Sequence, residues 1–156
     1  FAGELVSAEA EARAMLDLSE RQGIVWAAVD AWQTIAVVSQ TLGELASALE
    51  ARRNAARAAR SAGLKEREAM LTMNLGFALT TIGARNEALM EIETGLAKAH
   101  AVGSVGAVRH GQMNLLGWAT IMGGRRVRRI QTGNVADYVY AVIAGAVVLA
   151  TWGILR

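Results

Sequence analysis

A glycine recurs at every twentieth position along most of this chain, and that spacing constrains the fold more than any other feature. The six positions are Gly23, Gly43, Gly63, Gly83, Gly103 and Gly123. Glycine is favoured just past a helix end because it has no Cβ to clash in the left-handed conformation. The chain has no proline and is rich in Ala, Leu, Arg and Glu, which are good helix formers. The spacing therefore predicts an all-α fold of antiparallel helical hairpins, each about 40 residues long.

The apolar residues between the glycines recur at helical spacing. In residues 84–102 the apolar positions fall at steps of three or four and leave Glu87 and Glu91 for water; they are Ala88, Leu89, Ile92, Leu96 and Ala97. Residues 2–22 predict one further helix that would be the second helix of a preceding unit. Its inward positions are predicted to be Leu5, Ala8, Ala12, Leu16 and Leu18.

The stretch MNLGFALTTIGARNEALMEIETGLAKA resembles a tetratricopeptide repeat. The family's leucine and glycine pair matches Leu75 and Gly76, and its small crossing residue matches Ala88. Its large apolar residue and its next small residue match Ile92 and Gly95. The resemblance covers residues 24–123 and predicts a repeat domain over 1–124. It departs from the family in its longer unit, in its lack of proline, and in Arg52, which stands where an apolar residue is expected.

Stacked hairpins of this family offer a concave surface formed by the first helix of each unit. The resemblance therefore implies a partner-binding surface on this face, for a protein ligand. The residues that it implies are Gln33, Val37, Met73, Phe77, Asn114 and Trp118. For Phe77 and Trp118, simple core packing is the alternative interpretation. The resulting hypothesis is a non-catalytic scaffold for protein–protein interaction.

The C-terminal part, residues 125–156, is predicted to be a basic linker followed by an apolar helix, and it differs from the repeats in charge and hydropathy. Residues 1–100 carry 13 acidic and 10 basic residues, whereas residues 101–156 carry one acidic and six basic residues. Residues 138–155 contain no charge, which meets the lower limit for a membrane-spanning helix. The sequence thus predicts a C-terminal anchor that tethers a cytoplasmic repeat domain to the membrane, and the alternative is a buried helix that completes the stack.

The flanks of this apolar segment suit a membrane boundary. Aromatic rings settle at the interface, and arginines stay on the cytoplasmic side and attract anionic headgroups. The membrane-flanking residues predicted in this way are Arg125, Arg126, Arg128, Arg129, Tyr138, Tyr140 and Trp152. The arginine run could also neutralise nucleic-acid phosphates, but the preceding repeats are acidic and no recognition helix is evident, so the membrane role is favoured.

A second resemblance concerns residues 128–149 alone. The segment RRIQTGNVADYVYAVIAGAVVL resembles the last membrane helix of the large antiporter-like subunit of proton-pumping NADH:quinone oxidoreductase, through Gln131, Thr132, Gly133 and Tyr138. It implies a junction of two unrelated pieces near residue 120 and, as an alternative function, an accessory piece of a respiratory membrane arm. The family's proton-channel lysines and glutamates have no counterpart here, so pumping is not implied.

No constellation of residues in the sequence points to catalysis. The absence of cysteine excludes disulfides and thiolate chemistry. His100 and His110 lack metal-ligand spacing, and the glycine-rich stretches lack the pattern of a phosphate-binding loop. The glutamates lie among basic residues at helical spacing, as on a solvated face. The sequence therefore predicts a protein that is not an enzyme and that needs no cofactor or metal. A soluble helical regulatory domain is the remaining alternative.

Overall fold

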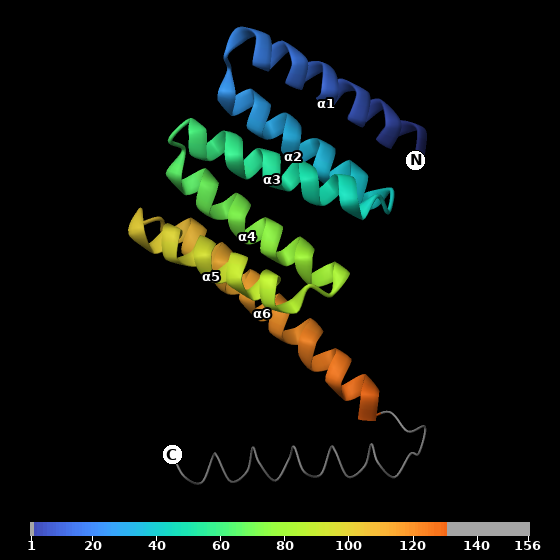
Figure 1. Cartoon of the computed structure of the whole chain (residues 1–156), viewed down its shortest axis with the longest axis vertical. Helices are drawn as coiled ribbons and strands as arrows, with labels where there is room; N and C mark the ends of the chain where they lie inside the picture. The colour runs from blue at the N-terminus through green and yellow to red at the C-terminus, as the bar shows by residue number, and fades with distance from the viewer. Residues whose placement is uncertain (1, 131–156) are drawn as a thin grey trace. The chain divides into compact units, whose positions relative to one another are not determined.

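The computed structural model describes residues 2–130, which form six α-helices and contain no strand. This confirms the predicted all-α class. The helices are α1 (Ala2–Gln22), α2 (Val25–Thr41), α3 (Leu45–Ser61), α4 (Lys65–Ile82), α5 (Arg85–Ala101) and α6 (Val105–Ile130). The chain divides into two units after Trp118, and we call residues 2–118 the helical body. Helices α1 to α5 lie side by side in chain order (Figure 1).

Five of the six predicted glycine turns are present, and they share one geometry. At the end of α2, Gly43 N–H donates to the Gln40 carbonyl at 3.1 Å and Glu44 N–H donates to the Ser39 carbonyl at 2.8 Å. This pair of bonds is the Schellman motif, which satisfies the last carbonyls of a helix. The glycine φ values lie between 68° and 85°, in the left-handed region that residues with a Cβ avoid. The same two bonds recur at Gly23, Gly63, Gly83 and Gly103.

The sixth predicted turn is wrong. Gly123 lies inside α6, which continues to Ile130, and a Cβ built on it meets nothing within 4 Å. Glycine permits a left-handed turn but does not impose one, so its position alone does not end this helix. Residues 125–130, predicted as a basic linker, accordingly have helical backbone.

The helices α4 and α5 approach closely at two glycines. A Cβ on Gly76 of α4 would lie 2.8 Å from the Ala88 carbonyl oxygen, and one on Gly95 of α5 would lie 2.8 Å from the Ala69 carbonyl oxygen. At such distances a methyl group displaces backbone, so only glycine fits. This confirms the prediction that small residues set the crossing of these helices. The family resemblance from which the prediction came stays a prediction.

The first part of α6 packs against α4 and α5 through small residues. Ala107 lies in a buried cluster with Ala69, Met73 and Ala99. A Cβ on Gly111 would clash with the Met73 sulfur. The side chain of Met73 is therefore enclosed by three helices and fully buried.

The first helix confirms the element predicted for residues 2–22 but not all of its inward face. Ala12 is buried, and Leu16 packs on the same cluster with Ile35 of α2. Leu18 is half exposed, so its predicted inward orientation is wrong. It lies two positions beyond Leu16, a rotation of about 200° on an α-helix.

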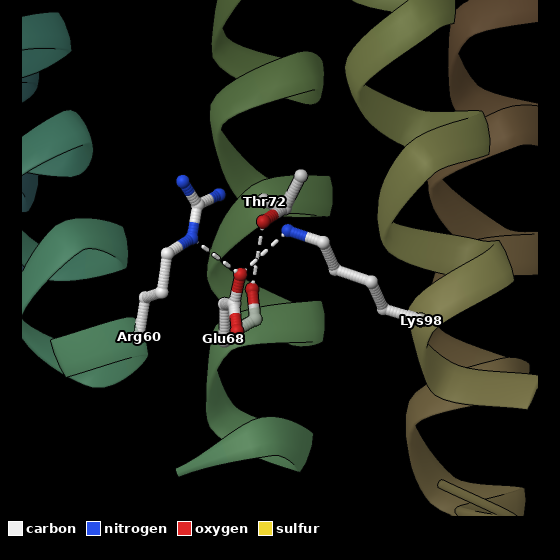
Figure 2. A network of polar contacts seen from close by, with 4 residues as sticks. All are labelled: Arg60, Glu68, Thr72 and Lys98. Atoms are coloured by element: carbon white, nitrogen blue, oxygen red, sulfur yellow. Dashed lines mark hydrogen bonds and ion pairs between the residues drawn. The ribbon is translucent and has the colours of Figure 1, made fainter. Parts of the chain in front are cut away.

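One carboxylate joins three helices, as Figure 2 shows. Glu68 of α4 accepts hydrogen bonds at Oε1 from Arg60 Nε of α3 at 2.8 Å and from Lys98 Nζ of α5 at 2.6 Å. The Thr72 hydroxyl donates to the Glu68 backbone carbonyl at 2.8 Å. The hydrogen bond from Lys98 lowers the pKa of Glu68 most, burial opposes that effect, and Arg60 adds to the lowering. The network ties α3, α4 and α5 together.

The predictions on the C-terminal segment fall largely outside the described residues. This holds for the apolar run 138–155, for Tyr138, Tyr140 and Trp152, and for the stretch 131–133 that carries the second resemblance. Arg125, Arg126, Arg128 and Arg129 lie on the last turns of α6. Within residues 2–130 no helix combines the length and the hydropathy of a membrane span.

Candidate binding surface

A groove opens between α2 and α4 at the start of α4. Its volume is about 540 Å³, within the range typical of ligand pockets. The Schellman turn at Gly63 joins α3 to α4, and Leu64, the residue after this glycine, lines the groove together with the first turns of α4. The lining residues are Gln33, Leu64, Lys65, Glu66, Arg67, Met70 and Asn74.

The wall of this groove is fixed by contacts between helices. Arg67 of α4 forms an ion pair with Asp30 of α2. Ser104, before α6, donates from Oγ to Glu66 Oε1 at 2.5 Å and accepts from the Ala107 N–H at 3.1 Å. The same serine therefore caps α6 and holds a groove residue. These contacts anchor two charged side chains and leave Gln33 and Asn74 as the uncharged polar groups of the lining.

A polar cluster extends from the groove to α6. His110 Nε2 lies 2.7 Å from Asn74 Oδ1 and 3.3 Å from the Asn114 amide nitrogen. A protonated Nε2 donates to Asn74, whereas an unprotonated Nε2 accepts from Asn114, so the tautomer of the ring decides which of the two bonds forms. Together with Gln33, these asparagines place one amide side chain on each of α2, α4 and α6.

Three of the six predicted partner-binding residues are half-buried and lie on or beside this surface. Gln33 lines the groove, Asn114 belongs to the polar cluster, and Phe77 lies against Gly117 of α6. Trp118, the fourth half-buried residue, packs on a buried cluster that includes Leu79 and Ala88. Both aromatic side chains therefore make the core contacts of the alternative interpretation. Val37 is exposed on α2, one turn after Gln33.

Met73 is the residue whose assignment the structure contradicts. Its side chain has no exposed surface, because α4, α5 and α6 enclose it, so it cannot contact a partner. The neighbouring residue Asn74 lines the groove instead. One position along an α-helix is a rotation of about 100°, which separates the core face from the groove face.

The sequence interpretation also missed Lys65, Glu66, Arg67 and the role of His110. Asn114 stands one repeat of 40 positions after Asn74, and this equivalence was a signal that could have identified Asn74. The contact between His110 and Asn74 had no such signal, because it depends on how α6 lies on α4. In residues 2–130 no three His, Asp or Glu side chains come together as metal ligands, and His100 is exposed on α5.

A second, smaller groove of about 250 Å³ lies between α3 and α5. Arg53, Arg57 and Arg60 line its α3 side, and Glu91 lines its α5 side. Arg60 forms an ion pair with Glu68, whereas Arg57 bonds to the uncharged Asn54. Three arginines thus face one lining carboxylate, that of Glu91, and the positive charge of this groove is only partly matched.

Comparison with known proteins adds no assignment. No family model matches the chain, and neither a curated protein nor a solved structure matches it.

Proposed function

We propose that the helical body is a non-catalytic scaffold that binds a peptide segment of a partner protein in the groove between α2 and α4. One observation carries the proposal: a groove of about 540 Å³ that combines apolar side chains with one amide side chain from α2 and one from α4. The repeated Schellman turns and the glycine crossings support the further proposal that the body is a helical-repeat stack of the tetratricopeptide type.

The chemistry of the lining suits a peptide. An extended peptide presents backbone N–H and C=O groups, and an amide side chain can both donate to and accept from such groups. Gln33 and Asn74 supply two such amides on opposite sides of the groove. Met70 and Leu64 supply half-buried apolar surface, and methionine adapts its shape to the side chain that it contacts. A short peptide with one apolar anchor fits these features.

The charges at the groove favour a ligand without a strong net charge. Lys65, Glu66 and Arg67 stand in succession at the start of α4, and Arg67 and Glu66 are already bonded within the described part of the chain. Of these three, Lys65 is the one that can pair with an acidic group of a ligand. Recognition would thus rest on backbone hydrogen bonds and one apolar contact more than on ion pairs.

A peptide-display selection on the full chain tests this proposal. Peptides that bind should bind Gln33→Ala and Asn74→Ala about tenfold more weakly, because each substitution removes one or two hydrogen bonds of about 0.5–1.5 kcal/mol. Glu93→Ala, on the exposed side of α5, is the matched control and should bind as the wild type does. Selected peptides that bind all three variants equally would show that the groove is not the site.

The membrane tether is a separate proposal, carried by the sequence of residues 125–156. It is tested by floating the intact chain with liposomes at alkaline pH, which strips peripheral proteins. Flotation is the expected result. Recovery in the soluble fraction would favour the alternative in which the apolar segment completes the helical stack.

A further inference from the structure

The smaller groove, between α3 and α5, has a surplus of positive charge that peptide binding between α2 and α4 does not use. Its volume is about 250 Å³. Arg53, Arg57 and Arg60 lie along its α3 side at steps of four and three positions, which places them on one helix face. The floor is formed by α4, where the lining residues Thr72 and Leu75 are buried. The groove is thus a small depression with guanidinium groups along one wall.

The charges are not spread evenly along this groove. The helices α3 and α5 run in the same direction on either side of α4 (Figure 1), and Arg60 and Lys98 bond to the same carboxylate, that of Glu68. Seven residues earlier on each helix, which is about two turns, stand Arg53 and Glu91. These two side chains are therefore at one level on opposite walls of the groove, and their charges balance that end.

Other carboxylates near the groove lie toward the same balanced end or point elsewhere. Glu50 stands three positions before Arg53, and Glu87 stands four positions before Glu91; both are exposed. Glu93 lies two positions after Glu91, a rotation of about 200° on an α-helix, so it points away from the groove. None of these three carboxylates lines the groove, and none compensates the charge at its opposite end.

That opposite end has more cations than carboxylates. Arg60 and Lys98 share Glu68, whereas Arg57 bonds only to the uncharged amide of Asn54 in the described part of the chain. Three positive charges thus stand around one negative charge, and two positive charges remain unmatched.

The guanidinium of Arg60 is held so that part of it remains available to a ligand. Its Nε donates to Glu68 at 2.8 Å, and Figure 2 shows its two terminal nitrogens pointing away from this carboxylate, toward the level of Thr72. Arg57 stands three positions before Arg60, so the two side chains are neighbours on one helix face. Both can therefore donate to a single group that lies in the groove beside Thr72.

We propose that this end of the groove binds a phosphate monoester group, which Arg57 and Arg60 hold by charge-assisted hydrogen bonds. A phosphate monoester carries a charge of about −1.5 to −2 at neutral pH. This charge matches the two unmatched positive charges, whereas a carboxylate would leave one of them. The planar guanidinium can also present two parallel donors to phosphate oxygens, and Lys98 contributes its charge at the edge of the site.

The proposed phosphate site is separate from the proposed peptide site. None of its residues lines the groove between α2 and α4, so it goes beyond peptide binding there and does not depend on it. Free phosphate esters and phosphorylated side chains of proteins both present the group that this site would recognise.

An NMR titration of the full chain with methyl phosphate tests the proposal, at neutral pH and with the ionic strength held constant by sodium chloride. Saturable shift changes are expected in the Nε–H groups of Arg57 and Arg60 and in the backbone amide of Thr72. Methyl sulfate has a similar shape but a single negative charge, so it should bind at least about threefold more weakly.

Two matched pairs of variants locate the site. Arg57→Gln should weaken the binding of methyl phosphate about tenfold, because it removes charge-assisted hydrogen bonds, whereas Arg109→Gln, at an exposed position on α6, should bind as the wild type does. Glu91→Gln removes the lining carboxylate and leaves Arg53 unmatched, so it should strengthen binding about two- to fivefold. Glu93→Gln, exposed on the same helix, should leave binding unchanged.

A folding control and a second ligand complete the experiment. Arg57 is exposed, so the helical circular dichroism and the melting temperature of Arg57→Gln should match those of the wild type. A short alanine peptide with one central phosphoserine distinguishes the two sources of phosphate. Tighter binding of this peptide than of methyl phosphate would indicate a phosphorylated protein, and weaker binding would indicate a free phosphate ester; both results support a phosphate site.

Four outcomes would overturn the proposal. The absence of a saturable shift at Arg57 and Arg60 would show that the surplus charge remains solvated. Equal affinity for methyl phosphate and methyl sulfate would contradict the match of two charges. An Arg109→Gln variant that loses as much affinity as Arg57→Gln would indicate a general attraction of anions to basic residues. A Glu91→Gln variant that binds no more tightly than the wild type would place the bound anion outside this groove.

Discussion

Replacing Glu68 by glutamine should destabilise the helical body by about 1–2 kcal/mol at neutral pH. The side chain of Glu68 is only 14% exposed and accepts two charge-assisted hydrogen bonds. Lys98 is 29% exposed and its bond is 2.6 Å long, so it accounts for most of the effect, since hydrogen bonds to charged groups contribute about 1.5–3 kcal/mol. Arg60 is 65% exposed, and such surface pairs contribute about 0.2–1 kcal/mol. Glutamine keeps an acceptor but loses the charge.

The destabilisation should depend on pH with a definite sign. Lys98 and Arg60 hold the pKa of Glu68 below its ordinary value, so the folded state binds the proton less readily than the unfolded state. The stabilisation from Glu68 is therefore fully present above the unfolded-state pKa, about 4. It is lost as the pH falls through the folded-state value. The difference between the wild type and Glu68→Gln should shrink over that range.

Urea denaturation of both proteins at neutral pH and at a series of acidic pH values measures this difference. Glu93→Gln, at an exposed position on α5, controls for the removal of one negative charge and should change the free energy of unfolding by less than about 0.5 kcal/mol. A Glu68→Gln variant as stable as the wild type at neutral pH would refute the stabilising role of this carboxylate. A deficit that stays constant down to the most acidic point would refute its lowered pKa.

Three other substitutions test the packing of the helices by thermal and urea denaturation. Gly76→Ala should lower the free energy of unfolding by about 2–4 kcal/mol, because the added methyl group would lie 2.8 Å from backbone atoms of α5. Gly106→Ala, with open space around the glycine, should raise it by up to about 1 kcal/mol. Equal effects of the two substitutions would contradict the close approach of α4 and α5 at Gly76. Gly83→Ala should lower the free energy of unfolding by about 1–2 kcal/mol, since the φ angle of Gly83 is 85°. Unchanged stability would show that the turn can adopt another backbone conformation at no cost. Arg52→Leu should leave the free energy of unfolding unchanged or raise it, because burial disfavours the charged guanidinium and lowers the pKa of Arg52. Its Nη2 bonds to Gln40 at 2.6 Å, but its buried Nε has no hydrogen-bond partner in the described residues. A loss of stability above about 2 kcal/mol would show that the bond to Gln40 outweighs the cost of burial.

The turns and the close helix contacts could be predicted from the sequence because they depend on local constraints. A left-handed residue at a helix end requires glycine, and so does the close backbone contact at Gly76. Gly123 shows where such a prediction fails, because glycine is also tolerated within a helix. A turn needs a following segment that packs back on its predecessor, and the glycine position alone carries no such information.

The surface could be predicted only coarsely. The repeat register selected Gln33, which lines the groove, and Asn114, which contacts His110, and their role in binding stays a prediction. On α4 it selected Met73 in place of Asn74, because a shift of one position turns a side chain from the groove into the core. The Glu68–Lys98 and His110–Asn74 contacts join side chains 30 and 36 positions apart. They depend on the rotation of each helix about its axis, which hydrophobic spacing does not define to the nearest position.

Occupation of the groove between α2 and α4 by a partner peptide is tested most directly by an amide NMR titration of the full chain with a peptide obtained by selection. The largest shift changes are expected in the side-chain amides of Gln33, Asn74 and Asn114 and in the backbone of residues 64–70. Shift changes confined to the exposed sides of α3 and α5, with the groove amides unmoved, would contradict peptide binding in this groove.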